Sequence, residues 1–238
     1  MSDLRDQIAV IVGSSSGMGR AAAVSYAEQG AKVVLAARSV DKLEELATQI
    51  GDDALVCPTD VEDSAQVESL IQKTIDTFGR VDILVYATGT NIPDRSLENL
   101  SYETWNMMIS TNLTGAFHCT KAVLPVMRQQ KAGLIIYLSS GCVQSPDVSG
   151  VSYQASKCGL SGLAHGTFKE EQANGIRTTV IFPGLCDTPL VFKRPTPTPP
   201  EVMAKALQPQ DVADACLFVA TLPSRTRVPE LVLLPAGL

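Results

Sequence analysis

The chain has 238 residues, of which 45% are hydrophobic and 18% are charged, and its formal net charge is −6. This length and composition allow one large buried core, so we expect a single α/β domain over residues 1–238. The charge is spread along the sequence without a run of Lys or Arg, which argues against nucleic acid or an anionic membrane as a partner.

The N-terminus and the cysteines indicate the compartment. Residues 1–7 are largely polar, and no apolar stretch approaches the roughly 20 residues needed to span a bilayer. The six cysteines lie far apart, with no CxxC pair and no His spacing typical of zinc. They are Cys57, Cys119, Cys142, Cys158, Cys186 and Cys216. We therefore expect a cytoplasmic protein with reduced, mostly buried thiols and no metal site.

Short β-branched or Leu-rich runs alternate with longer segments of helical periodicity, which is typical of βαβ units. The predicted strands are 8–12, 32–37, 54–57, 83–86, 133–138, 177–182 and 230–234. The predicted helices are 17–29, 41–50, 64–78, 101–130, 151–173 and 209–221. Because the strands are nearly all apolar, we expect a seven-stranded parallel sheet covered by helices on both faces. Five prolines within 189–200 predict an inserted loop over about 185–207, with a short helix at 201–207.

A glycine-rich loop follows the first predicted strand. Its sequence, GSSSGMG, contains Gly13, Gly17 and Gly19. Glycines let a backbone turn tightly and approach a pyrophosphate, whose charge then lies at the N-terminus of the next helix. The spacing differs from the common GxGxxG fingerprint, but its place between a strand and a helix predicts a dinucleotide site.

The end of the second predicted strand indicates which dinucleotide binds. An NAD-selective site usually places Asp or Glu there, to accept a hydrogen bond from the ribose 2′-hydroxyl. This chain has Arg38 and Ser39 instead. A guanidinium suits a 2′-phosphate, so NADP(H) is the predicted cofactor, although Arg38 could also be a solvated loop residue. Ser16 carries no charge and adds no second basic contact.

Tyr153 and Lys157 form the strongest candidate for catalysis. Their i, i+4 spacing places both side chains on one face of a predicted helix. A phenol titrates near pH 10, so it needs nearby positive charge to exchange protons at neutral pH. Ser140 ends a predicted strand and can donate a hydrogen bond to a substrate oxygen, and Ser139 is the neighbour it could be confused with.

The order of these motifs resembles the short-chain dehydrogenase/reductase family over essentially the whole chain. That resemblance implies a single-domain Rossmann fold and an oxidoreductase that interconverts a ketone or aldehyde and an alcohol by hydride transfer, with Tyr153 as general acid/base. It assigns catalytic roles to Asn112, Ser140, Tyr153 and Lys157, where Asn112 helps to hold a water for proton relay. The cofactor-binding residues that it implies are Gly13, Ser15, Ser16, Gly17, Met18, Gly19, Arg38, Ser39, Asp60, Val61, Ala87, Thr88, Gly89, Tyr153, Lys157, Pro183, Gly184, Cys186 and Thr188.

One departure from the family pattern affects the cofactor loop. Many members have Asn-Asn-Ala-Gly after the fourth strand, whereas this chain has Tyr86-Ala87-Thr88-Gly89. The asparagines are thought to brace the sheet and the loop, so their loss puts local stability or cofactor affinity in doubt.

The resemblance also implies a homotetramer or homodimer that pairs through helices 101–130 and 151–173. Small residues on the second helix would permit close approach. They are Ser161, Gly162, Ala164 and Gly166. His118 and His165 also lie on these helices, where packing or an interface is the expected role.

We expect an apolar small-molecule substrate in a cleft formed by 142–151 and the proline-rich loop. The expected apolar wall is Val143, Pro146, Val148, Leu185, Leu190, Phe192 and Met203. Lys193 and Arg194 could contact an anionic group, although a solvated loop is the simpler interpretation. The alternatives are a 3-oxoacyl thioester reductase, for which Lys193, Arg194 and Arg95 are the candidate basic contacts, and a non-catalytic dinucleotide-sensing module. A halohydrin-cleaving lyase of the same fold would have arginine in place of Lys157.

Overall fold

A parallel seven-stranded sheet forms the centre of the molecule in the computed structural model, which describes residues 3–238. Met1 and Ser2, the first residues of the polar N-terminal segment, lie outside the described residues. The strand order is β3-β2-β1-β4-β5-β6-β7, with all neighbours parallel. The strands are β1 (Ile8–Val12), β2 (Lys32–Ala37), β3 (Ala54–Pro58), β4 (Ile83–Tyr86), β5 (Gly133–Leu138), β6 (Ile176–Pro183) and β7 (Glu230–Leu233). The predicted α/β fold class is confirmed.

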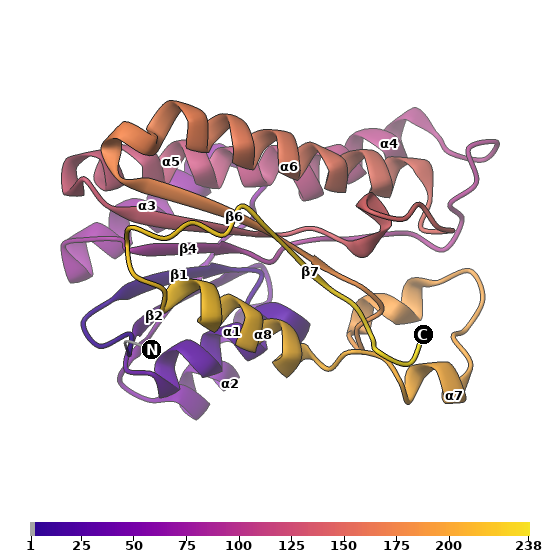
Figure 1. Cartoon of the computed structure of the whole chain (residues 1–238), viewed down its shortest axis with the longest axis horizontal. Coiled ribbons are helices and arrows are strands. Elements are labelled where there is room, and N and C mark those ends of the chain that lie inside the picture. Colours follow the sequence, from indigo (N-terminus) through magenta and orange to yellow (C-terminus); the bar gives the residue numbers. More distant parts are fainter. Residues whose placement is uncertain (1–2) are drawn as a thin grey trace.

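Helices cover both faces of the sheet (Figure 1). One layer contains α1 (Gly17–Glu28), α2 (Val40–Ile50) and α8 (Pro209–Ala220). The other contains α3 (Ser64–Phe78), α4 (Tyr102–Ile109), α5 (Gly115–Gln130) and α6 (Val151–Glu171). Short helical turns complete the fold at η1 (Ser110–Thr114), η2 (Gly141–Val143), η3 (Gln172–Asn174), η4 (Pro189–Lys193) and α7 (Pro200–Met203). Within residues 3–238, no helix combines the length and apolarity needed to cross a membrane.

Burial of both sheet faces explains the apolar strands. All residues of β1 and β4 are buried, and alternate residues of these strands belong to two separate hydrophobic cores. Leu84 packs in the core beneath α3, α5 and α6, whereas Ile83 and Val85 pack in the core above α1, α2 and α8. Removing this much apolar surface from water is the main stabilising contribution to such a fold.

The predicted helix 101–130 is not a regular α-helix. A five-residue π-helical segment, Ser110–Thr114, separates α4 from α5. Buried contacts favour the wider turn, because the Tyr86 hydroxyl donates to the Thr111 carbonyl oxygen at 2.5 Å. Periodicity alone could not reveal it, since the contact that favours the wider turn comes from Tyr86 on another element.

The proline-rich loop is tied closed at its base. Leu207 donates its backbone N–H to the Leu185 carbonyl at 2.9 Å, and Asp187 donates to the Leu207 carbonyl at 2.8 Å. The short helix predicted at 201–207 is wrong in its bounds: α7 covers only Pro200–Met203, since residues 206–207 turn back into this pairing. The loop therefore lies beside the carboxyl ends of the strands, next to the C-terminus (Figure 1).

Candidate functional site

The glycine loop forms a cradle that side chains would fill. Gly13 and Gly17 have φ angles of +91° and +54°, a region that favours glycine. A methyl group on Gly19 would lie 2.3 Å from the Gly13 carbonyl oxygen. Ser16, the N-cap of α1, makes no side-chain capping hydrogen bond, so the N–H groups of the first turn are available to an anion. These features fit the pyrophosphate of a dinucleotide.

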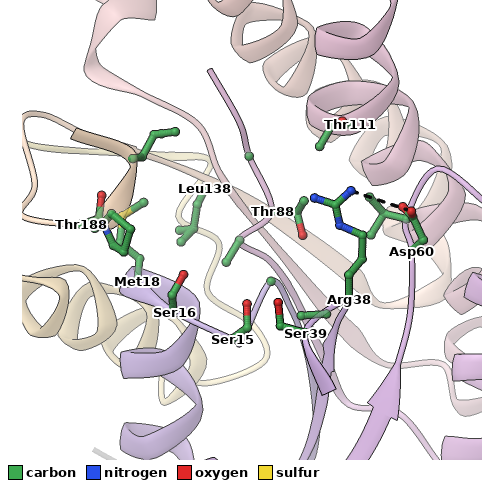
Figure 2. Close-up of a pocket in the computed structure, with 18 of the residues that line it drawn as sticks. Ser15, Ser16, Met18, Arg38, Ser39, Asp60, Thr88, Thr111, Leu138 and Thr188 are labelled. Carbon is green, nitrogen blue, oxygen red and sulfur yellow. Dashed lines mark ion pairs between the residues drawn. The ribbon is translucent and has the colours of Figure 1, made fainter. Parts of the chain in front are cut away.

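Arg38 lies at one end of the cavity that this loop opens into (Figure 2). Its side chain is 71% exposed, and one guanidinium nitrogen lies 4.0 Å from a carboxylate oxygen of Asp60. An ion pair of this length at an exposed site contributes little to stability. It also leaves most of the guanidinium N–H donors free. The group is therefore available to a phosphate.

The cavity has a volume of about 290 Å³ and extends from Arg38 and Asp60 to Met18 and Thr188 (Figure 2). It brings together most of the predicted cofactor residues: Gly13, Ser15, Ser16, Gly17, Met18, Arg38, Ser39, Asp60, Val61, Ala87, Thr88, Gly89, Tyr153, Lys157 and Thr188. Nine further residues line this cavity. Leu190 and Lys193 were expected at the substrate cleft, and Ser139 was considered only as the neighbour of Ser140. Sequence reasoning missed the others, namely Ala37, Thr59, Glu62, Thr111, Leu138 and Pro189. Ala37, Thr59 and Glu62 directly neighbour predicted residues, so position after a strand could have identified them.

Four predicted cofactor residues lie outside this cavity. Gly19 packs beneath the loop against Gly13, where its role is to permit close approach. Pro183, Gly184 and Cys186 line a second cavity of about 520 Å³. The two cavities share Tyr153 and Thr188, which places the phenol at their junction.

The second cavity differs from the expected apolar cleft. Only Leu185 and Leu190 of the seven expected wall residues line it. Val148 and Phe192 are 83% and 86% exposed, because the loops that carry them turn outward. Three charged residues also line this cavity, namely Arg95, Asp147 and Arg194.

Tyr153, Lys157 and Ser140 come together beside this junction, as the motif order predicted. Tyr153 and Lys157 are 8% and 4% exposed. The Lys157 ammonium donates to the Leu138 carbonyl oxygen at 2.9 Å and lies 5.9 Å from the centre of the Tyr153 ring. Its ammonium is thus held by the end of β5, close to the phenol.

Burial sets the proton affinities of the pair. Burial raises the pKa of Tyr153, while a hydrogen bond with Ser140 and the charge of Arg95 act in the opposite direction. Burial also lowers the pKa of Lys157 to about 8. A protonated phenol aimed at the junction of two cavities can act as a proton donor at neutral pH.

Asn112 lies behind the cavity wall. Its side-chain oxygen accepts from the Thr90 backbone N–H at 2.8 Å, and its amide nitrogen donates to the Thr90 carbonyl and the Ser156 hydroxyl, each at 3.0 Å. A methyl group on Gly89 would lie 3.0 Å from the Lys157 nitrogen. Asn112 thereby fixes the loop after β4 against the helix that carries Tyr153 and Lys157.

The segment Tyr86-Ala87-Thr88-Gly89, which departs from the family pattern, makes its own contacts to the neighbouring helix and the glycine loop. Tyr86 is fully buried and donates to the Thr111 carbonyl. A methyl group on Gly13 would lie 2.7 Å from the Thr88 backbone nitrogen, so the two loops pack without space between them. The structure therefore offers contacts in place of the missing asparagines.

Comparison with known proteins agrees with this geometry. The family model of the short chain dehydrogenases matches residues 7–197. An uncharacterised oxidoreductase of Staphylococcus haemolyticus is 35% identical over 236 residues, covering 99% of this chain and 100% of the relative. Among solved structures, the closed form of serine dehydrogenase complexed with NADP+ has a TM-score of 0.91 at 28% identity, covering 98% of this chain and 96% of that chain. A 3-ketoacyl-(acyl-carrier-protein) reductase from Brucella melitensis complexed with NADH has a TM-score of 0.90 at 26% identity, covering 98% of each chain. The chain thus belongs to the short chain dehydrogenase family and is an oxidoreductase of that family.

Proposed function

We propose that this protein interconverts a ketone or aldehyde and an alcohol, uses NADP(H), and employs Tyr153 as its general acid/base. The observation that carries this proposal is the place of Tyr153, buried at the junction of the two cavities beside Ser140 and Lys157. In this arrangement the first cavity holds the cofactor and the second holds the substrate.

Each residue has a role that its position supports. The glycine loop and the N-terminus of α1 hold the pyrophosphate, and Arg38 takes the 2′-phosphate. The reduced nicotinamide supplies a hydride to the carbonyl carbon when the cofactor is bound. Tyr153 gives its hydroxyl proton to the carbonyl oxygen, and Ser140 donates a hydrogen bond to the same oxygen. Lys157 holds the nicotinamide ribose and returns the proton to Tyr153, while Asn112 keeps the loop beside Lys157 in place.

The preference for NADP(H) rests on Arg38 and the absence of a carboxylate directly after β2. The NADP+ complex of serine dehydrogenase supports it, whereas the reductase from Brucella melitensis is complexed with NADH. The same reductase makes a 3-oxoacyl thioester the second candidate substrate. Arg95 and Arg194 line the second cavity, as basic contacts for such a substrate would, whereas Lys193 lines the first cavity.

We also propose a homodimer or homotetramer that associates through the α4, α5 and α6 layer. Large hydrophobic side chains are exposed on these helices: Tyr102 is 87%, Phe117 is 47% and Val151 is 44% exposed. Gly162 and Gly166 have open space around them, as the predicted close approach requires. Ala164 is instead fully buried in the core and cannot contribute to a subunit contact.

The test is oxidation of NADPH and of NADH against ketones, aldehydes, oxo acids and an acetoacetyl thioester, with Tyr153→Phe as the variant. We expect turnover with NADPH to exceed that with NADH, and Tyr153→Phe to lower kcat by about 10²- to 10⁴-fold, the usual contribution of general acid catalysis. Cofactor binding, measured by calorimetry, should remain.

Tyr26→Phe is the matched control, since it removes a buried hydroxyl that bonds to the Cys216 carbonyl at 3.1 Å, away from both cavities. Normal turnover in Tyr153→Phe would refute the proton-transfer role. Cofactor binding without turnover of any compound would instead support the dinucleotide-sensing alternative.

A further inference from the structure

Two guanidinium groups line the second cavity beside the candidate catalytic residues. Arg95 comes from the segment after β4, and Arg194 comes from the proline-rich loop directly after η4. Both are half-buried, and both share the cavity with Ser140 and Tyr153. Exposed surface arginines are common, but two within one concave site are not explained by solvation alone.

The hydrogen bonds of Arg95 leave part of its fork unused. Its Nε donates to the Ile92 carbonyl at 2.6 Å, and its Nη2 donates to the Lys193 carbonyl at 2.8 Å. Its Nη1 has no hydrogen-bond partner among residues 3–238. The carbonyl contacts fix the plane of the guanidinium without neutralising its charge.

The positive charge of Arg194 likewise has no carboxylate partner among the described residues. Its Nη1 donates to the Thr198 hydroxyl at 3.2 Å, and within the described part of the chain neither Arg95 nor Arg194 forms an ion pair. Burial and the nearby charge of Arg194 both lower the pKa of Arg95. Two like charges in a half-buried site are unfavourable unless an anion joins them.

Within residues 3–238, the one acidic side chain that lines the cavity with Arg95 and Arg194 does not neutralise the positive charge of both guanidinium groups. Asp147 is the sole acidic side chain among the described residues that line this cavity, and Leu238, the last residue of the chain, lines it as well. Asp147 is exposed, and its Oδ1 accepts from the Ser149 backbone N–H at 2.8 Å. The side chains that line this cavity thus include two guanidinium groups without an ion pair and one carboxylate that already accepts a hydrogen bond.

The fold fixes Arg95 relative to the reaction centre. Gly150, the residue before α6, has a φ of +91°, and a methyl group on it would lie 2.8 Å from the Arg95 Cβ. The Asn91 amide also donates to the Ser149 carbonyl at 3.0 Å. Arg95 is thus packed against the start of the helix that presents Tyr153 three residues later.

We propose that Arg95 and Arg194 together bind a carboxylate of the substrate, so that short-chain oxo acids and hydroxy acids are the substrate class. This inference rests on the proposed function, since it places the reacting carbonyl between Ser140 and Tyr153. Guanidinium forks match carboxylates in geometry and charge. The apolar lining residues, such as Leu185, Leu190 and Cys142, then surround the short carbon chain. Because both arginines lie inside the cavity, they fit an anion on a small substrate better than the acidic surface of a carrier protein.

The experiment compares short oxo acids with their methyl esters in steady-state NADPH oxidation by the full chain. Wild type should have a kcat/KM for the best acid at least about 10-fold above that for its ester. Arg95→Gln and Arg194→Gln should each lower the acid-to-ester ratio of kcat/KM by about 10- to 100-fold, mainly through KM of the acid. Arg95→Lys keeps the charge without the fork and should recover part of the ratio.

Arg225→Gln is the matched control, because Arg225 is exposed in the turn after α8 and lines neither cavity. It should leave the ratio unchanged. Preference for esters in wild type, or equal losses with acid and ester in both variants, would overturn the inference while the proposed function stands.

A binding measurement separates the two proposals if no compound is turned over. Titration of a short hydroxy acid into the wild-type protein with NADP+ should show binding that Arg95→Gln weakens by about 10-fold or more. Binding of this kind would support the arginine pair even if the proposed reaction failed. Absence of binding, or equal binding by the variant, would overturn it.

Discussion

At the scale of single residues, Lys157 lowers the stability of the folded chain at a position where its charge serves the chemistry. Its ammonium is almost fully buried, with one carbonyl partner at 2.9 Å and a pKa lowered by burial to about 8. Burial of a charge is unfavourable because the interior replaces water poorly. A side chain of similar length without charge would suit this position better in the absence of cofactor, which indicates that Lys157 is there for its chemistry.

Lys157→Met should therefore stabilise the cofactor-free protein while it abolishes turnover. Since the pKa of Lys157 lies below its ordinary value of 10.5, the unfolded chain binds more protons than the folded chain between about pH 8 and 10.5. Wild-type stability from this group thus rises with pH across that window. We expect the variant to be more stable by about 1–3 kcal/mol at pH 7, and the difference to shrink above pH 8.

Urea unfolding at pH 7 and pH 9.5, without cofactor, measures this difference. Lys169→Met, an exposed substitution on the same helix, is the control and should show no such pH dependence. A variant less stable than wild type at pH 7 would contradict the argument.

At the scale of elements, the π-helical segment Ser110–Thr114 connects the sheet to the site. Its Asn112 binds the backbone of Thr90, and its Thr111 carbonyl accepts from Tyr86 at the end of β4. A methyl group on Gly115 would lie 2.6 Å from the Tyr86 hydroxyl, so the helix approaches the sheet closely here. Tyr86 is accordingly a positioning residue for Asn112.

Tyr86→Phe should lower both stability and activity. Loss of the hydroxyl leaves a buried carbonyl without this partner, at a cost of about 1–2 kcal/mol. A small displacement of the segment should also reduce kcat by about 10-fold with little change in the KM of the substrate. Steady-state kinetics and urea unfolding of the same preparations measure both effects.

Tyr137→Phe provides the comparison. Tyr137 lies beside Tyr86 on β5, is equally buried, and bonds through its hydroxyl to Thr120, outside the π-helical segment. The Tyr137→Phe variant should be less stable than wild type by about 1 kcal/mol, with kcat unchanged. An equal kcat loss in both variants would mean that Tyr86 acts through general stability alone.

At the scale of the whole molecule, the layer of α4, α5 and α6 exposes aromatic side chains on its outer surface. Phe117 on α5 is 47% exposed beside Lys121, whose ammonium lies 5.9 Å from the ring centre. If this layer pairs subunits, light scattering should give a mass of two or four chains for wild type, and Phe117→Asp should lower it. Val40→Asp, at an exposed site in the opposite layer, should not. A monomeric wild type would refute the proposed association.

The sequence by itself determined the alternation of strands and helices, the glycine loop and the pairing of Tyr153 with Lys157 on one helix face, because each depends on local periodicity or short spacing. The place of Ser140 beside this pair was implied by the motif order that the chain shares with its family. The sequence did not reveal the π-helical segment, which depends on Tyr86 from another strand. It offered Arg95 and Arg194 only as candidate basic contacts, and it did not reveal that these residues, 99 positions apart in the chain, line the same cavity as Tyr153. Only the tertiary structure decided these features, because packing between distant segments fixes where a loop side chain points, and no local pattern records that.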